Sequence, residues 1–179
     1  MKRAQLAAGI VGTLTAATLA LSTSPASASG TYSGRAYVYG AGDWYDDWTD
    51  EGILSMATNT KSNATCLWQK ILWADGYLSY TSDIDGDFGQ TTAWATVNWQ
   101  VRLNLENIDG VVGKETFKAA ARIDDPKRGL KDGNLDGAVD SYVGFVHTIN
   151  VTRDSDGRYH FYDGNGDARI AGYDYRTCS

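Results

Sequence analysis

The glutamates are the first residues to consider for chemistry, because a carboxylic acid can protonate a leaving group. The sequence contains three of them, Glu51, Glu106 and Glu115. Hydrolysis of a glycosidic bond requires one such acid with a raised pKa opposite a second carboxylate. Nothing around these glutamates predicts burial beside a partner, although the many aspartates leave that chemistry open. The pattern therefore favours a protein without catalytic residues.

The two histidines suggest a different chemistry, metal-assisted hydrolysis. His147 and His160 are expected on neighbouring strands, with Asp154, Asp156 and Asp163 in the turns beside them. Zinc takes such nitrogen and carboxylate ligands, so a hydrolytic site on the C-terminal strands is one alternative. Histidines on strands are more often structural or solvated than metal-bound. We therefore predict no metal site.

Calcium is a second alternative, suggested by an acidic run in the second half of the chain. Asp132, Asn134 and Asp136 match the start of an EF-hand loop, but position twelve is Val143 instead of a bidentate glutamate. Residues 163–167 form another partial match that lacks the central glycine. Runs of this kind also form ordinary turns. The prediction is therefore no cofactor, with calcium left open.

The N-terminal segment predicts export. Residues 1–28 combine a basic start, an apolar run and an A-x-A cleavage site after Pro25, which is typical of a secretory signal peptide and too short for a stable membrane anchor. No later stretch is long and apolar enough to span a bilayer. The expected location of the mature chain is extracellular or cell-wall associated.

The two cysteines, Cys66 and Cys178, both lie in the exported part. In an oxidising compartment the default for such a pair is one intramolecular disulfide. Two separate buried thiols remain the alternative. A nucleophilic cysteine would have to be free, which export disfavours.

The charge of the chain limits its partners. Cleavage of the predicted signal peptide removes Lys2 and Arg3, which changes the net charge from −6 to −8. An acidic chain without a cluster of Lys and Arg does not suit nucleic acid or anionic lipid. We therefore predict no nucleic-acid partner and no membrane partner, and we expect a monomer.

A five-residue motif occurs twice in the middle of the chain, at residues 85–89 (DGDFG) and 109–113 (DGVVG). In each copy an Asp can cap the backbone, a Gly can adopt a left-handed turn conformation, and a hydrophobic side chain points inward. Helix-like segments follow at 91–100 and 115–121. Their spacing predicts a turn–helix unit used twice, in which Trp94, Val97 and Val101 form the buried stripe of the first helix.

The remaining segments complete an α+β fold. Ser62 and Asn63 are good N-cap residues for a further helix, which ends near residues 75–76. The β-branched and aromatic runs 141–151, 158–162 and 168–175 predict a three-stranded antiparallel meander. The predicted domain organisation is a signal peptide (1–28), an irregular aromatic-rich arm (29–61), a small three-helix bundle (62–125), a linker (126–140) and a C-terminal β appendage (141–179).

The helical part contains a characteristic series of residues: Trp68-Gln69, Gly76-Tyr77, both Asp-Gly turns, Thr92, Trp99-Gln100 and Thr116-Phe117. In this order they resemble the peptidoglycan-binding domain family, a three-helix module often attached to bacterial wall hydrolases. Phe117 stands where the family often has Trp, and Gln90 and Lys114 stand where Pro is common. The resemblance covers about a third of the chain.

The resemblance implies non-catalytic attachment to peptidoglycan, and the predicted signal peptide implies that the protein is secreted. The alternatives are a small wall-degrading hydrolase of the amidase or carboxypeptidase type, and a protein-interaction module that uses the helices as a scaffold. The resemblance places the ligand-binding residues in the motif itself: Asp85, Gly86, Phe88, Gly89, Trp99, Gln100, Asp109, Gly110 and Gly113.

Overall fold

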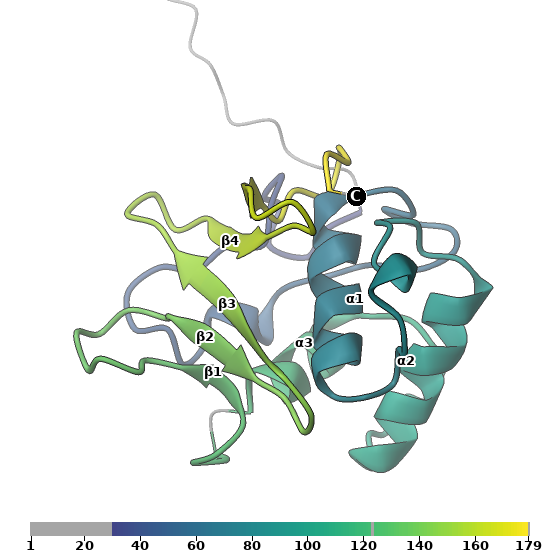
Figure 1. The fold of residues 1–179 in the computed structure, drawn as a ribbon, viewed down its shortest axis with the longest axis horizontal. Coiled ribbons are helices and arrows are strands. Elements are labelled where there is room, and N and C mark those ends of the chain that lie inside the picture. The colour runs from purple at the N-terminus through teal and green to yellow at the C-terminus, as the bar shows by residue number, and fades with distance from the viewer. Residues whose placement is uncertain (1–29, 123, 179) are drawn as a thin grey trace, which may run out of the picture.

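A computed structural model of the chain describes residues 30–122 and 124–178, and the predicted signal peptide lies outside them. Within these residues the fold is α+β, as predicted (Figure 1). The helices are α1 (Asn63–Ala74), α2 (Gln90–Arg102) and α3 (Lys114–Ala121), with short 3₁₀ helices η1 (Asp47–Thr49) and η2 (Thr81–Asp83). The strands are β1 (Gly129–Lys131), β2 (Ser141–Val143), β3 (Thr148–Arg153), β4 (Tyr159–Tyr162) and β5 (Ala168–Ile170).

The five strands form one antiparallel sheet in the order β1-β2-β3-β4-β5, so each strand pairs with its neighbour in sequence. The sequence predicted only three strands. One addition is β1, which lies in the predicted linker and pairs Leu130 with Tyr142 of β2. A meander needs only short connections, which explains why a turn-rich segment can hold a strand.

The prediction of one continuous strand over residues 141–151 is wrong, because the structure divides this segment into β2 and β3. The division falls at a turn that packs on the end of α1, where Val146 and His147 donate backbone hydrogen bonds of 2.9 and 3.0 Å to the carbonyl of Ala74. Gly144 makes this approach possible, since a Cβ there would lie only 2.3 Å from the same oxygen. The turn therefore fixes the sheet against the helix.

Helix α1 lies between the sheet and α2 (Figure 1), and α3 packs on β1 and η1. Ser62 caps α1 by accepting a hydrogen bond of 3.0 Å from the Thr65 amide, as predicted. The Trp68 ring of α1 contacts the rings of Trp99 in α2 and Phe117 in α3, at centroid distances of 5.2 and 6.0 Å.

The buried face of α2 differs from the predicted stripe. Trp94 and Val101 are 61% and 55% exposed. The face that meets α1 instead contains small residues such as Ala93 and Thr96, and the Thr96 hydroxyl accepts a 2.8 Å hydrogen bond from the Trp68 indole. Small side chains allow the two helices to approach closely, which periodicity alone does not reveal.

The N-terminal arm is irregular, as predicted, but it is part of the core. Trp48 and Leu54 are fully buried, and the Trp48 ring lies 5.7 Å from that of Phe117. The arm, the helices and the sheet thus share one core. None of the helices in the described part of the chain is long and apolar enough to cross a bilayer.

Candidate functional site

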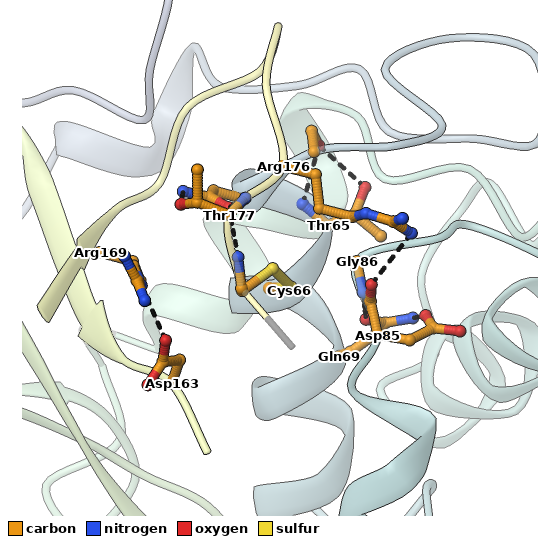
Figure 2. Close-up of a disulfide and its surroundings, with 12 residues drawn as sticks. Thr65, Cys66, Gln69, Asp85, Gly86, Asp163, Arg169, Arg176 and Thr177 are labelled. Carbon is orange, nitrogen blue, oxygen red and sulfur yellow. Dashed lines mark hydrogen bonds and ion pairs between the residues drawn. A yellow bond between two sulfur atoms is a disulfide. The ribbon is translucent and has the colours of Figure 1, made fainter. Parts of the chain in front are cut away.

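The first turn is held by one glutamine of α1, and we call this arrangement the first turn unit. The amide nitrogen of Gln69 donates to Asp85 Oδ1 (2.9 Å), the Asp87 carbonyl (3.1 Å) and Thr92 Oγ1 (3.0 Å). Its amide oxygen accepts from the backbone N–H of Gly86 (2.7 Å). Figure 2 shows Gln69 and Asp85 facing each other beside Gly86. The side chain of Gln69, which is 1% exposed, therefore satisfies the backbone of the turn.

The second turn unit repeats this pattern with a glutamine of α2. The amide nitrogen of Gln100 donates to Asp109 Oδ1 (3.4 Å), the Val111 carbonyl (2.9 Å) and Thr116 Oγ1 (3.1 Å). Its oxygen accepts from the Asp109 and Gly110 amides at 3.1 and 2.9 Å. Each of the four hydrogen bonds of Gln69 has a counterpart at Gln100, and the second unit has one more, from the Asp109 amide. The repeated motif predicted this correspondence only in outline.

Most of the predicted ligand-binding residues serve this internal structure. The side chains of Phe88, Trp99 and Gln100 are fully buried, and Val112 in the second turn is buried like Phe88 in the first. The Trp99 indole donates to the Asp75 carboxylate at 2.6 Å.

The other predicted residues have varied exposure. Gly86 and Gly110 are buried, Gly89 and Gly113 are half-buried and cap α2 and α3, and Asp85 and Asp109 are exposed. The surface next to the motif is therefore a better candidate for ligand contact than its buried members.

A groove opens beside each turn, at equivalent positions. The first turn groove, about 160 Å³, is lined by Asp83, Asp85, Asp87 and the start of α2. The second turn groove, about 380 Å³, is lined by Asn107, Asp109 and the start of α3.

The two turn grooves differ in the chemistry of their rims. The second groove adds the Tyr32 ring from the arm, with the Lys114 ammonium 4.6 Å above its centroid. The first places Gln90 where the second has Lys114. The second is therefore the more varied surface, combining an aromatic ring and a cation with its acidic residues.

A third and larger groove of about 700 Å³ lies where α2 and α3 meet the turn between β2 and β3, and we call it the junction groove. Its apolar lining residues are Leu103, Leu105, Ala119, Pro126 and Phe145. Its charged lining residues are Glu115, Lys118, Arg122, Asp124 and Asp125. No local pattern in the sequence predicts this groove, because its walls are far apart along the chain.

One wall of the junction groove is fixed by a buried ion pair. The Arg122 guanidinium binds Asp75 through both terminal nitrogens. The same carboxylate accepts from the Tyr142 hydroxyl (2.9 Å) and the Phe145 amide (3.0 Å). Burial, together with the adjacent Asp75 charge, raises the pKa of Tyr142 well above its usual value. This network attaches α1, the end of α3 and the β2–β3 turn to one another.

The glutamates considered for acid catalysis have structural contacts. Glu51 is fully buried, accepts from the Tyr39 amide at 2.9 Å and binds the Tyr173 hydroxyl. Burial raises the pKa of Glu51 to about 8, although it lines none of the three grooves. The pKa of Glu115 is lowered by hydrogen bonds from Asn107 and from the Glu106 amide. A raised pKa without access to a groove does not make a general acid.

The histidines considered for zinc do not both lie on strands. His147 is in the β2–β3 turn, where its ring stacks on Trp73 at 3.9 Å, and His160 on β4 binds Asp154 at 2.8 Å. Burial acts to raise the pKa of Asp154, but hydrogen bonds from His160 and Arg158 outweigh it and lower that pKa. Among the described residues, no group of three or more His, Cys, Asp or Glu side chains is arranged to hold a metal ion.

The acidic run considered for calcium forms the loop between β1 and β2. Asp132 accepts from the amides of Asp136 (3.2 Å) and Gly137 (2.7 Å), and Asn134 accepts from Asp136 (3.1 Å). These oxygens bind the loop's own backbone, as in an ordinary Asx turn. Calcium binding stays an untested alternative.

The predicted disulfide joins Cys66 to Cys178 across 112 residues. It lies next to the first turn unit, and Arg176 from the same C-terminal segment donates to the Asp85 carbonyl at 3.3 Å (Figure 2). The C-terminal segment thus covers one side of the first turn.

Residues 62–120 match the family model described as a putative peptidoglycan binding domain. The match runs from the N-cap of α1 to the last turn of α3 and confirms the resemblance predicted from the sequence.

One curated relative is the uncharacterized protein FadG of Bacillus subtilis (strain 168). It is 36% identical over 73 residues, which make up 41% of this chain. The chain covers only 12% of that relative's length. No solved structure matches this chain.

Proposed function

We propose that this chain is a secreted, non-catalytic protein that binds peptidoglycan through its helical part. The observation that carries the proposal is the family match of residues 62–120. In both turn units of the motif a buried glutamine accepts a hydrogen bond from the glycine amide of the turn, which supports the proposal. The expected location is the cell wall or the space outside it.

Hydrogen bonds and shape are the expected means of recognition. The chain carries a net charge of −6, so long-range attraction to anionic wall polymers is not expected to drive binding. Three grooves adjoin the helices, and each combines polar and apolar groups. We expect a monomer that binds neither nucleic acid nor membrane.

Co-sedimentation with purified wall sacculi tests this function. The full chain from residue 29 should appear in the pellet with sacculi and stay in the supernatant with cellulose, an insoluble glucan without peptides. Protein that remains in the supernatant with sacculi at micromolar concentration would contradict the proposal. Heat-unfolded protein is the control for nonspecific trapping.

The hydrolase alternative makes a different prediction in the same experiment. A wall hydrolase would clear a turbid suspension of sacculi and release soluble fragments, whereas a binding protein leaves the turbidity unchanged. If clearing occurred, loss of the activity in His147→Ala would point to the C-terminal strands.

A further inference from the structure

The junction groove is built jointly by the family-matched helices and by residues beyond them. Leu103, Leu105 and Lys118 belong to the matched segment, whereas Arg122 and Phe145 lie outside it. The Asp75 carboxylate binds both Arg122 and the Phe145 amide, so the wall of the groove that these two residues form is fixed in place. The C-terminal β appendage, through Phe145, thus completes a groove on the helical part of the chain.

The size of the junction groove suits a small ligand. Its volume of about 700 Å³ is larger than the 380 and 160 Å³ of the two turn grooves. Sites for small ligands commonly measure roughly 300–1,000 Å³. The junction groove therefore has room for several amino-acid residues.

The lining of the junction groove does not suit a sugar ring, which binds flat against an open aromatic face. Phe145 is the aromatic residue of its lining. The guanidinium carbons of Arg128, Arg122 and Arg102 lie 4.2, 4.7 and 5.2 Å from the centroid of that ring. These cation–π contacts occupy the surface on which a sugar would stack.

The lining matches a short peptide instead. Leucine, alanine and proline side chains form an apolar floor that fits small methyl-bearing side chains, and charges of both signs stand at the rim. Lys118 is exposed, and no ion pair joins it to any residue in 30–122 or 124–178. It is free to receive a carboxylate, and Asp124 at the same rim can receive an amine. The peptide stems of peptidoglycan carry alanine methyl groups, free carboxylates and a diamino acid.

We propose that the junction groove binds the peptide stem of peptidoglycan and not its glycan strand, with Lys118 receiving a stem carboxylate. This assignment rests on the proposed function and specifies which part of the wall polymer is recognised. It also gives the C-terminal β appendage a role, since Phe145 and its arginines form the wall that excludes sugar rings.

Competition for sacculi tests the ligand class. The probes are the tetrapeptide l-alanyl-γ-d-glutamyl-l-lysyl-d-alanine and the N-acetylglucosamine tetramer, each added to the full chain bound to sacculi. The tetrapeptide should release the protein into the supernatant, and the sugar tetramer should not. Release by the sugar alone, or by neither probe, would overturn the assignment while sacculus binding itself stood.

A charge reversal with a matched control tests the location. Lys118→Glu should weaken tetrapeptide binding, measured by calorimetry, by about tenfold, because it replaces an attraction with a repulsion. Lys114→Glu makes the same change one turn earlier on α3, but it faces the second turn groove. That control should alter binding by less than about twofold.

A steric variant provides a second test of the same location. Ala119→Trp fills the junction groove and should abolish tetrapeptide binding, with circular dichroism and thermal melting as checks on folding. If this variant fails to fold, the comparison of Lys118→Glu with Lys114→Glu still decides the location. Equal effects of the two lysine variants would overturn it. A wild-type chain that binds neither sacculi nor tetrapeptide would overturn the assignment and the proposed function together.

Discussion

The first and second turn units share four corresponding glutamine hydrogen bonds but have different neighbours. In the first unit, a Cβ at Gly86 would lie 2.7 Å from the sulfur of Cys66 and 2.9 Å from that of Cys178, so this turn is packed against the disulfide. In the second, a Cβ at Gly110 would meet the Ala93 carbonyl of α2 at 3.0 Å. The disulfide thus supports one turn and not its counterpart.

The N-terminal arm contacts both turns, but through different segments. At the first turn the Phe88 amide donates a 2.6 Å hydrogen bond to the Thr60 carbonyl, whereas the second turn bonds to the buried part of the arm around Leu54. Leu54 and Val112 exchange backbone hydrogen bonds of 3.0 and 2.9 Å. Just before Leu54, the Gly52 amide donates to the Tyr173 hydroxyl at 3.0 Å, and that hydroxyl also binds the buried Glu51. The repeated motif therefore specifies the inside of each turn, and long-range contacts anchor it. The stability that the disulfide gives to the first turn should be lost with reductant, and the stability that the Glu51 contacts give to the second turn should depend on pH.

Removal of the disulfide should have the largest effect. Closing a loop of 112 residues is worth about 4–5 kcal/mol in the chain-entropy model. Reduction, or the double variant Cys66→Ala/Cys178→Ala, should lower the free energy of unfolding in urea by up to that amount. Amide exchange should then increase at Gly86 and Asp87 more than at Gly110 and Val111. Equal loss of protection at both turns would show that they do not depend on separate anchors.

The Glu51 anchor should make stability depend on pH. Burial raises the pKa of Glu51 from an ordinary 4.5 to about 8. The folded state therefore holds a proton that the unfolded state has released, so stability is full below about pH 4.5 and falls as the pH rises to about 8. The loss is on the order of 5 kcal/mol, at roughly 1.4 kcal/mol for each tenfold change in proton affinity.

Glu51→Gln is the variant that isolates this carboxyl group. The amide stays neutral at every pH, so the variant should lack most of the decline and should unfold at a higher urea concentration than the wild type at pH 8.5. Unfolding curves from pH 4 to 9 provide the measurement. A decline of the same size in both proteins would assign it to other groups, such as Asp47, whose pKa burial also raises.

The sequence allowed the local features to be predicted, since each depends on neighbouring residues. The Ser62 cap, the two Asp-Gly turns and the buried Phe88 follow from short patterns, and the pairing of Cys66 with Cys178 follows from their number and from the predicted export. The family motif also identified the right part of the chain. Most of the motif residues stabilise the turns, and the prediction that they contact the ligand stays a prediction.

Other features depend on contacts between distant segments and could not be read from the sequence. Trp94 follows the helical period of a buried stripe, but α1 packs against the small residues next to it. The break at Gly144 requires the Ala74 carbonyl, which is 70 residues away along the chain. The junction groove likewise needs Arg122 and Phe145 to meet at Asp75. Only the folded chain brings these groups together.

The equivalence of the two turn units should appear as equal effects of equivalent substitutions. Gln69→Leu and Gln100→Leu keep the side-chain volume and leave the N–H groups of Gly86 and Gly110 without their acceptor. Each should destabilise the fold by about 3 kcal/mol, since several buried polar groups lose their partners at once. Urea unfolding of the two variants measures this.

Comparison of these two variants with and without reductant separates the contribution of the glutamine hydrogen bonds from that of the disulfide. With the disulfide intact, a much smaller effect at Gln69 than at Gln100 would mean that the Cys66–Cys178 bond holds the first turn without its glutamine. After reduction any such difference should become small, because the four hydrogen bonds of Gln69 all have counterparts at Gln100. Persistence of a difference would mean that the turns differ internally, despite their matching geometry.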